Sequence, residues 1–157
     1  MVVVRFGLWG LAIFSVSLFV YASVVSAEVV TDVGQDGTLT LESGKQVALA
    51  GVQMDAEGVS VLRVLAQKQD LRFQLLANSS PGAKESAYVY LQAKYLRFPV
   101  KPEGIPDEQE ILLNEFLVSV GAAKVVESQD FSRKAQLLKA QAEAKRKGEG
   151  VWSYEPS

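Results

Sequence analysis

Two carboxylates follow the apolar segment VALAGVQMDAEG, which runs from residue 47 to residue 58. Asp55 and Glu57 stand just past its apolar part, where a buried strand would deliver them to the edge of a sheet. Paired carboxylates in that position suit acid–base chemistry or the binding of a metal ion. The structural alternative is that both acids begin the next helix, whose dipole favours negative charge at this end.

The amino-acid composition limits which chemistry is possible. The chain has no histidine and no cysteine. This excludes a histidine base, a Ser-His-Asp arrangement, thiol catalysis, disulfides and every metal site built on those two residues. Any catalysis must therefore rest on Asp, Glu, Lys, Arg or Tyr, or on a cation bound by hard oxygen ligands, such as calcium or magnesium.

The N-terminal segment has the pattern of a targeting sequence. One basic residue, Arg5, precedes a long apolar run that ends in the compact residues Val25, Ser26 and Ala27. We predict a secretory signal peptide over residues 1–27, cleaved after Ala27, and a periplasmic or secreted domain over residues 28–157. The alternative is an uncleaved membrane anchor, because the uncharged stretch of about 22 residues is long enough to span a bilayer.

The remaining pattern predicts one domain that positions these residues. Alternating and apolar runs indicate five strands, at about residues 28–33, 38–41, 46–53, 71–77 and 87–100. Helical spacing indicates three helices, at about residues 57–69, 111–120 and 129–147, the second preceded by acids that suit a helix start. The expected fold class is α+β and β-rich: a five-stranded barrel of the oligonucleotide-binding (OB-fold) type with three helices.

The C-terminal third carries a family resemblance. LLNEFLVSVGAAKV begins at Leu112, and the charged segment KAQAEAKRKGEGVWS follows it. The order of Asn114-Glu115, Gly121 and a final Gly-x-Trp-Ser around Trp152 resembles the staphylococcal nuclease-like (thermonuclease) family. On physical grounds these four residues are structural: Asn114 is suited to bonding loop backbone, Gly121 to ending a helix, and Trp152 to covering a core. The resemblance spans about residues 28–153.

The resemblance implies a nuclease site with a carboxylate-bound calcium ion, a glutamate that positions or activates water, and two arginines that stabilise charge on the phosphate. When the Leu-Ala-Gly core is aligned, the first arginine falls at Ala48 and the metal-binding aspartate at Gln53. The Pro-Glu pair falls at Asp55-Ala56. Asp55 and Glu57 are therefore out of step with the family positions.

The other implied site positions are altered as well. In the turn before residue 38, a glycine stands where the resemblance implies the family's first metal-binding carboxylate, and Asp36 lies one position away. Lys84 stands where the second arginine is implied, and lysine lacks the guanidinium fork that grips a phosphate. We therefore expect a degenerate catalytic site. If the protein is active, the candidate catalytic residues are Asp55, Glu57 and Lys84, and the candidate calcium ligands are Asp36 and Asp55.

Binding without catalysis is the function that the sequence favours. Tyr88 and Tyr90 alternate on one strand face and are candidates for stacking on nucleic-acid bases, with Lys84 and Arg97 nearby. The alternative is that both tyrosines are half-buried barrel residues. We expect a binding or assembly module for a protein partner or nucleic acid. The alternatives are an active calcium-dependent nuclease, or a membrane-anchored accessory subunit if the N-terminal segment is retained.

Overall fold

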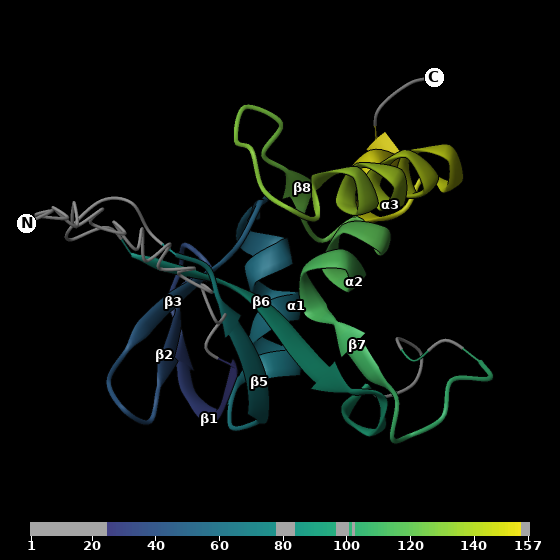
Figure 1. The fold of residues 1–157 in the computed structure, drawn as a ribbon. Coiled ribbons are helices and arrows are strands. Elements are labelled where there is room, and N and C mark those ends of the chain that lie inside the picture. The colour runs from purple at the N-terminus through teal and green to yellow at the C-terminus, as the bar shows by residue number, and fades with distance from the viewer. Residues whose placement is uncertain (1–24, 78–83, 97–100, 102, 155–157) are drawn as a thin grey trace, which may run out of the picture.

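The computed structural model describes residues 25–77, 84–96, 101 and 103–154. A barrel occupies one side of this region, and two of its helices are stacked on the other side (Figure 1). Five strands form the barrel: β1 (Val25–Val33), β2 (Leu39–Leu41), β3 (Gln46–Leu49), β5 (Asp70–Leu75) and β6 (Glu85–Gln92).

Antiparallel pairing joins these strands in the order β3-β2-β1-β5-β6, and a parallel pairing between β3 and β6 closes the circle. The closing pair sets Val47 opposite Glu85 and Leu49 opposite Ala87. A short strand, β7 (Glu110–Leu112), pairs with the end of β6, beyond the residues of β6 that pair with β3. The closed barrel with three helices confirms the predicted α+β fold.

Alternation of side chains explains the barrel strands. Leu39 and Leu41 are buried while Thr40 between them is only half-buried, and Leu71 and Phe73 alternate in the same way with the outward-facing Arg72. The interior therefore fills with leucine, valine and phenylalanine side chains from every strand, which gives each strand one apolar face to bury.

The third predicted strand is wrong in its extent. We expected one strand over residues 46–53, but β3 ends at Leu49 and a separate strand, β4 (Val52–Gln53), pairs with β8 (Lys124–Val125). Gly51 lies between them with a φ of 73°. A Cβ there would lie 2.4 Å from the Phe131 ring. The chain turns at this glycine because no larger residue fits the turn or the space.

The described residues form three α-helices: α1 (Ala56–Ala66), α2 (Leu113–Ser119) and α3 (Lys134–Lys147). Helix α1 buries Val59, Leu62 and Leu65, and α2 packs on both α3 and β6. Gly121 follows α2 with a φ of 69°, and Gly148 ends α3 with a φ of 64°. Both glycines end their helices as predicted.

The other boundaries differ from the expected ones. Strand β6 ends at Gln92, and a 3-10 turn, η1 (Ala93–Tyr95), follows it, so the strand predicted over residues 87–100 is shorter. Glu110 belongs to β7 and not to the start of a helix. Helix α3 begins at Lys134 and not at residue 129. A second 3-10 turn, η2 (Gly150–Tyr154), follows α3.

Candidate functional site

The turn before β2 holds the first candidate residue, Asp36. Its Oδ1 accepts a hydrogen bond from the Thr38 N–H at 3.1 Å, and the Gly34 N–H donates to the Thr38 carbonyl at 2.8 Å. Gly37 takes a φ of 79° between them. The aspartate thus stabilises its own turn, as short polar side chains do. Its second carboxylate oxygen, Oδ2, bonds to a different partner.

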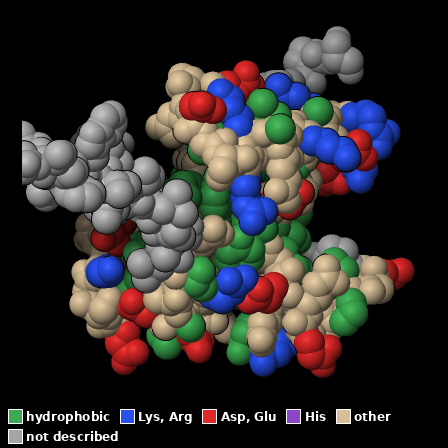
Figure 2. Space-filling model, in the orientation of Figure 1, with side chains coloured by type: hydrophobic (Ala, Val, Ile, Leu, Met, Phe, Trp, Pro, Cys, Tyr) green, Lys and Arg blue, Asp and Glu red, His purple; other side chains and the backbone are tan. Residues whose placement is uncertain are grey.

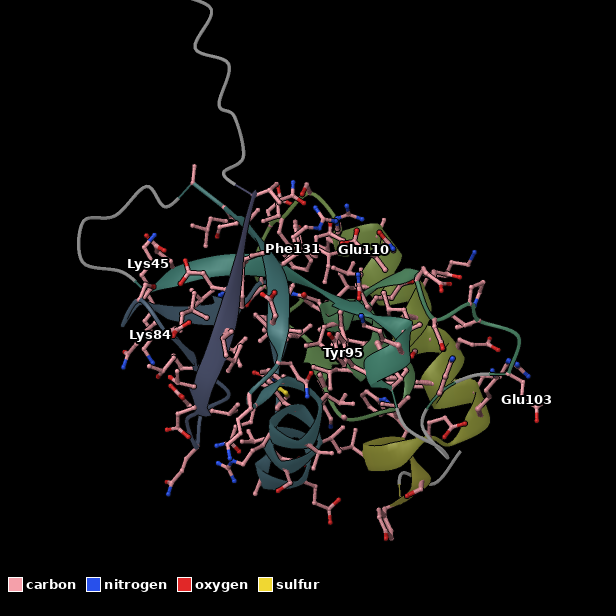
Figure 3. The ribbon with its side chains drawn as sticks, turned by 90° about the horizontal axis from the view of Figure 1, so that it is seen from below. Lys45, Lys84, Tyr95, Glu103, Glu110 and Phe131 are labelled. Carbon is pink, nitrogen blue, oxygen red and sulfur yellow. The ribbon has the colours of Figure 1, made fainter. Side chains whose placement is uncertain are left out.

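That partner is Lys84, which immediately precedes β6. Its Nζ lies 2.6 Å from Asp36 Oδ2 and 3.0 Å from Thr38 Oγ1. The hydrogen bond from Lys84 and the one from the Thr38 N–H lower the pKa of the Asp36 carboxyl below its ordinary value. Two candidates from distant parts of the sequence therefore meet as an ion pair on the surface of the barrel. Figure 3 shows Lys84 near Lys45 at one end of the molecule, away from Glu110.

Asp55 and Glu57 begin helix α1, as the structural alternative predicted. Asp55 is the residue that caps α1, and its Oδ1 accepts a hydrogen bond from the Gly58 N–H at 2.9 Å. Glu57 lies in the first turn and is exposed. One side chain therefore satisfies a backbone donor that the helix leaves unpaired, and the other adds negative charge beside the positive end of the helix dipole.

The candidate calcium ligands do not fit a calcium site. The Asp36 carboxylate accepts hydrogen bonds from the Lys84 ammonium group and from the Thr38 N–H in its own turn. The Asp55 carboxylate accepts one from a backbone N–H in the first turn of α1. Across the described ranges, no three acidic side chains are grouped so that they could hold one metal ion. Calcium takes six to eight oxygen ligands, several of them from carboxylates, and this donor set does not supply them.

The positions implied for the first arginine and for the metal-binding aspartate carry neutral side chains. Ala48 lies in the closing pair of the barrel, opposite Ser86, and is half-buried. Gln53 lies in β4, opposite Lys124, and is exposed. A nuclease site built here would have neither a guanidinium group on β3 nor a carboxylate at position 53, where the resemblance implies the metal-binding aspartate.

Tyr88 is buried and Tyr90 is half-buried. Tyr88 is 1% exposed, and its Oη lies 3.0 Å from Ser132 Oγ and accepts the Arg133 N–H at 3.1 Å. Tyr90 donates to Gln74 Oε1 at 3.0 Å. The buried ring of Tyr88 offers no face to a base, so the alternation along β6 does not produce a pair of open stacking platforms.

The outer face of Tyr90 belongs to a cluster that the sequence did not reveal. The Arg72 guanidinium lies 4.3 Å from the centre of the Tyr90 ring and forms two hydrogen bonds with Glu110, at 2.7 and 2.5 Å. Arg133 Nη2 donates to Tyr90 Oη at 2.9 Å. Glu110 is one of the acids expected at the start of the second helix, but it lies in β7. In the sequence, the one feature that indicates this cluster is the outward position of Arg72 in an alternating strand.

The basic side chains of the described residues lie on several separate elements. Arg97 lies outside the described residues, and Lys94 Nζ lies 4.9 Å from the centre of the Tyr95 ring. At the end of α3, Arg146 and Lys147 both pair with Glu143. Acidic and basic side chains are interspersed on the face shown in Figure 2. On that face, the described residues show no continuous basic stripe of the kind that is typical of a nucleic-acid interface.

The four residues of the C-terminal motif have structural positions. Asn114 is completely buried, and its side chain accepts the Val89 N–H at 2.9 Å and donates to the carbonyls of Ala50 and Ala87 at 3.0 and 3.2 Å. Ala50 lies in the turn after β3, so this bond to loop backbone is as expected, and Val89 and Ala87 lie on β6. Glu115 accepts a hydrogen bond from Gln136 on α3 at 2.6 Å.

The last element of that motif is the ring of Trp152. It is buried, and the ammonium groups of Lys124 and Lys145 lie 4.5 and 4.4 Å from the ring centre. Next to it, Gly121 approaches the chain so closely that a Cβ would lie 2.1 Å from the Glu149 carbonyl oxygen. The motif therefore joins α2, α3 and η2 into one packed unit.

Comparison with known proteins adds one finding. Residues 82–154 match the family model described as staphylococcal nuclease homologue. The matched region begins just before β6 and includes α2, α3 and η2, so it covers the part of the chain where the sequence motif was concentrated. No curated protein matches the chain significantly. No helix of the described residues is long and apolar enough to cross a membrane.

Proposed function

The chain carries a domain of the staphylococcal nuclease homologue family, and from this premise we propose that it is a binding module that does not cleave nucleic acids efficiently. The family resemblance implies a site in which two arginines and a set of carboxylates act together. Losing one part of such a cooperating site already lowers activity by orders of magnitude.

The observation that carries the proposal is the ion pair between Lys84 and Asp36, with Nζ and Oδ2 2.6 Å apart. An anionic phosphate needs cations whose charge is available to it, and calcium needs carboxylates that are not occupied by an ammonium group. Here the cation in the second arginine position and the acid beside the metal position neutralise each other. Ala48 supplies no charge in the first arginine position.

A protein partner fits the surface better than a nucleic acid does. The formal net charge is −2, and the tyrosines that were candidates for base stacking are buried or covered by Arg72. Nucleic-acid binding would need phosphate contacts from a concentrated basic patch. We propose that the partner is a protein, and that nucleic-acid binding is the second form that the same module could take.

The proposal includes export. The N-terminal pattern supports a signal peptide cleaved after Ala27, which would place the domain in the periplasm or outside the cell. Retention of the segment would make the protein a membrane-anchored accessory subunit with the same domain outside the cytoplasm. Direct sequencing of the N-terminus of the exported protein distinguishes the two forms, because only cleavage leaves Glu28 as the first residue.

The activity test compares the purified protein with variants of its own acids. Single-stranded DNA and RNA are incubated with the protein in calcium and in chelator, and product lengths are measured. The variants are Asp36→Asn, Asp55→Asn and Glu57→Gln. The matched control is Glu108→Gln, because Glu108 is an exposed acid between η1 and β7, outside the candidate site.

We expect no chelator-sensitive cleavage by any of these proteins. Cleavage by the unmodified protein that is lost in Asp55→Asn or Glu57→Gln, and kept in Glu108→Gln, would show an active nuclease and overturn the proposal. Retention of an oligonucleotide without cleavage, weakening as salt rises, would support the nucleic-acid form of the module. Neither cleavage nor retention would support a protein partner.

A further inference from the structure

Strand β1 begins upstream of the proposed cleavage point. It starts at Val25, and residues 25–27 pair with residues 74–72 of β5 in an antiparallel ladder. On its other side, the same stretch of β5 pairs with residues 88–90 of β6. In the uncleaved chain, β5 is therefore bonded on both sides along this stretch. Cleavage after Ala27 removes three residues that belong to the barrel wall.

The ladder shows which backbone groups would lose their partners. The Val30 N–H donates to the Gln69 carbonyl at 3.0 Å, and hydrogen-bonded pairs alternate along an antiparallel ladder. In the register of β1 and β5, Ser26 and Phe73 fall at such a pair. Cleavage therefore frees the N–H and the carbonyl of Phe73, whose side chain is completely buried in the barrel.

The rest of the barrel does not depend on the three removed residues. Glu28 and Val29 still pair with β5, and Val30 and Val33 still pair with β2. The barrel stays closed along most of β1, and only the edge of β5 at residues 72–74 opens. Open strand edges of this kind attract further strands unless something covers them.

We propose that, in the processed protein, residues 72–74 of β5 form a docking edge for an extended segment of a partner protein, which takes the place that residues 25–27 hold in the uncleaved chain. The inference rests on the proposed function, because it needs both export and cleavage after Ala27. It goes further by assigning the binding surface and the form of the ligand: a peptide strand that adds to an existing sheet.

The place now held by residues 25–27 defines the chemistry of this ligand. Ser26 is half-buried opposite Phe73, so the partner needs a small side chain at the central position. The flanking residues Val25 and Ala27 are exposed, so the neighbouring positions tolerate larger side chains. Ala27 borders a hollow that is also lined by Arg72, Tyr90 and Glu110, where a polar side chain of the partner has space and hydrogen-bonding groups.

The outer side of this edge is already ordered. Arg72 is fixed by its two hydrogen bonds to Glu110 and by its position over the Tyr90 ring. A partner strand therefore meets a β5 segment whose outward side chain needs no rearrangement, which lowers the entropic cost of binding. Main-chain hydrogen bonds supply affinity, and the small central side chain supplies selectivity.

The test uses the full gene in a bacterial host that exports the protein. The unmodified protein is compared with Ala27→Leu, because a large residue at the cleavage point blocks processing while the exposed position tolerates it. The probe is a labelled peptide with the sequence of residues 22–27, ASVVSA. The control is the same peptide with Ser26→Pro, which removes the N–H at the central position.

The expected results are an N-terminus at Glu28 in the unmodified protein, and binding of ASVVSA to that protein but not to the unprocessed Ala27→Leu variant. The proline peptide should bind roughly tenfold more weakly or not at all, because it lacks one backbone donor. The Phe73 amide hydrogen should exchange quickly in the processed protein and roughly tenfold more slowly when the peptide is added.

The inference would be overturned by an N-terminus other than Glu28, by equal binding or no binding of the two peptides, or by a Phe73 amide that is as protected in the processed protein as in the Ala27→Leu variant. Dimerisation of the processed protein through the same edge would also overturn it, since the occupant would then be a second copy. None of these results bears on whether the protein has nuclease activity, which the oligonucleotide assay tests separately.

Discussion

Lys84 Nζ and Asp36 Oδ2 lie 2.6 Å apart, although 48 residues separate the two in the chain. The contact joins the turn before β2 to the start of β6 and lies where the family resemblance implies phosphate and metal binding. The charges that would act on a substrate are instead directed at each other. This relation can be tested through its dependence on pH.

We predict that Lys84→Met reduces stability by less than about 1 kcal/mol at neutral pH, because both side chains are largely exposed to solvent. The pKa of the Asp36 carboxyl is lower in the folded protein than its ordinary value of 3.8. The pair therefore stabilises the fold fully above about pH 4, and its contribution falls as pH drops further. Urea unfolding at several pH values measures this difference.

The matched control is Lys139→Met. Lys139 is an exposed lysine for which the described part of the chain shows no ion pair. Its removal should change stability equally at neutral and acid pH. A difference between the unmodified protein and Lys84→Met that stays constant down to about pH 2 would contradict the pairing.

Asn114→Ala should be strongly destabilising. The substitution leaves the buried Val89 N–H and Ala50 carbonyl without the side-chain partners they have now. Each unsatisfied buried group costs about 1–3 kcal/mol, so we expect a loss of about 2–5 kcal/mol in the free energy of unfolding. Gln136→Ala removes an exposed hydrogen bond to Glu115 and should cost less than about 1 kcal/mol. Similar losses for both variants would contradict the role of Asn114.

The pair of Arg72 and Glu110 should show a measurable but modest coupling. A double-mutant cycle with Arg72→Met and Glu110→Gln is expected to give about 0.5–1 kcal/mol, because the pair is bidentate but about two-fifths exposed. The coupling should shrink in molar salt. Arg72→Lys should lose most of it, since an ammonium group cannot form both hydrogen bonds. Full retention of the coupling in Arg72→Lys would contradict this geometry.

Gly58→Ala tests the contact between α1 and the turn after α2. Alanine is favoured over glycine in a helix by about 1 kcal/mol, so propensity alone predicts a gain. A Cβ at this position would lie 1.9 Å from the Ala122 carbonyl oxygen, however. We expect the clash to win and the substitution to destabilise the protein by about 1–3 kcal/mol. Ser60→Ala, on the exposed side of the same helix, should change stability by less than about 0.5 kcal/mol. A stabilised Gly58→Ala protein would contradict the close approach.

Local patterns predicted most of the barrel. The alternation of Leu39, Thr40 and Leu41 gives β2 because one side of each strand must be buried, and the glycines after α2 and α3 end those helices for reasons of backbone conformation. The break at Gly51 was missed because its cause, the Phe131 ring, comes from a distant part of the chain.

The candidate site was predictable only in part. Asp55 was recognisable as a helix cap because its partner, Gly58, is three residues away. The partners of Asp36 and Glu110 lie 48 and 38 residues away, and no local signal identifies them. Glu110 resembled an acid at a helix start for that reason. Contacts between distant segments decide which charged side chains remain available to a ligand. The local sequence pattern does not show these contacts.

The position of Asn114 has a consequence for how the protein is made. Its amide bonds both strands of the parallel closure just past their paired residues, at Ala50 after β3 and at Val89 within β6. The closure is therefore held by a residue that is synthesised after both strands. A growing chain that has emerged only as far as β6 lacks the hydrogen bonds of the Asn114 side chain. We therefore expect nascent chains to remain sensitive to protease until residue 114 has left the ribosome, and then to become resistant in a single step.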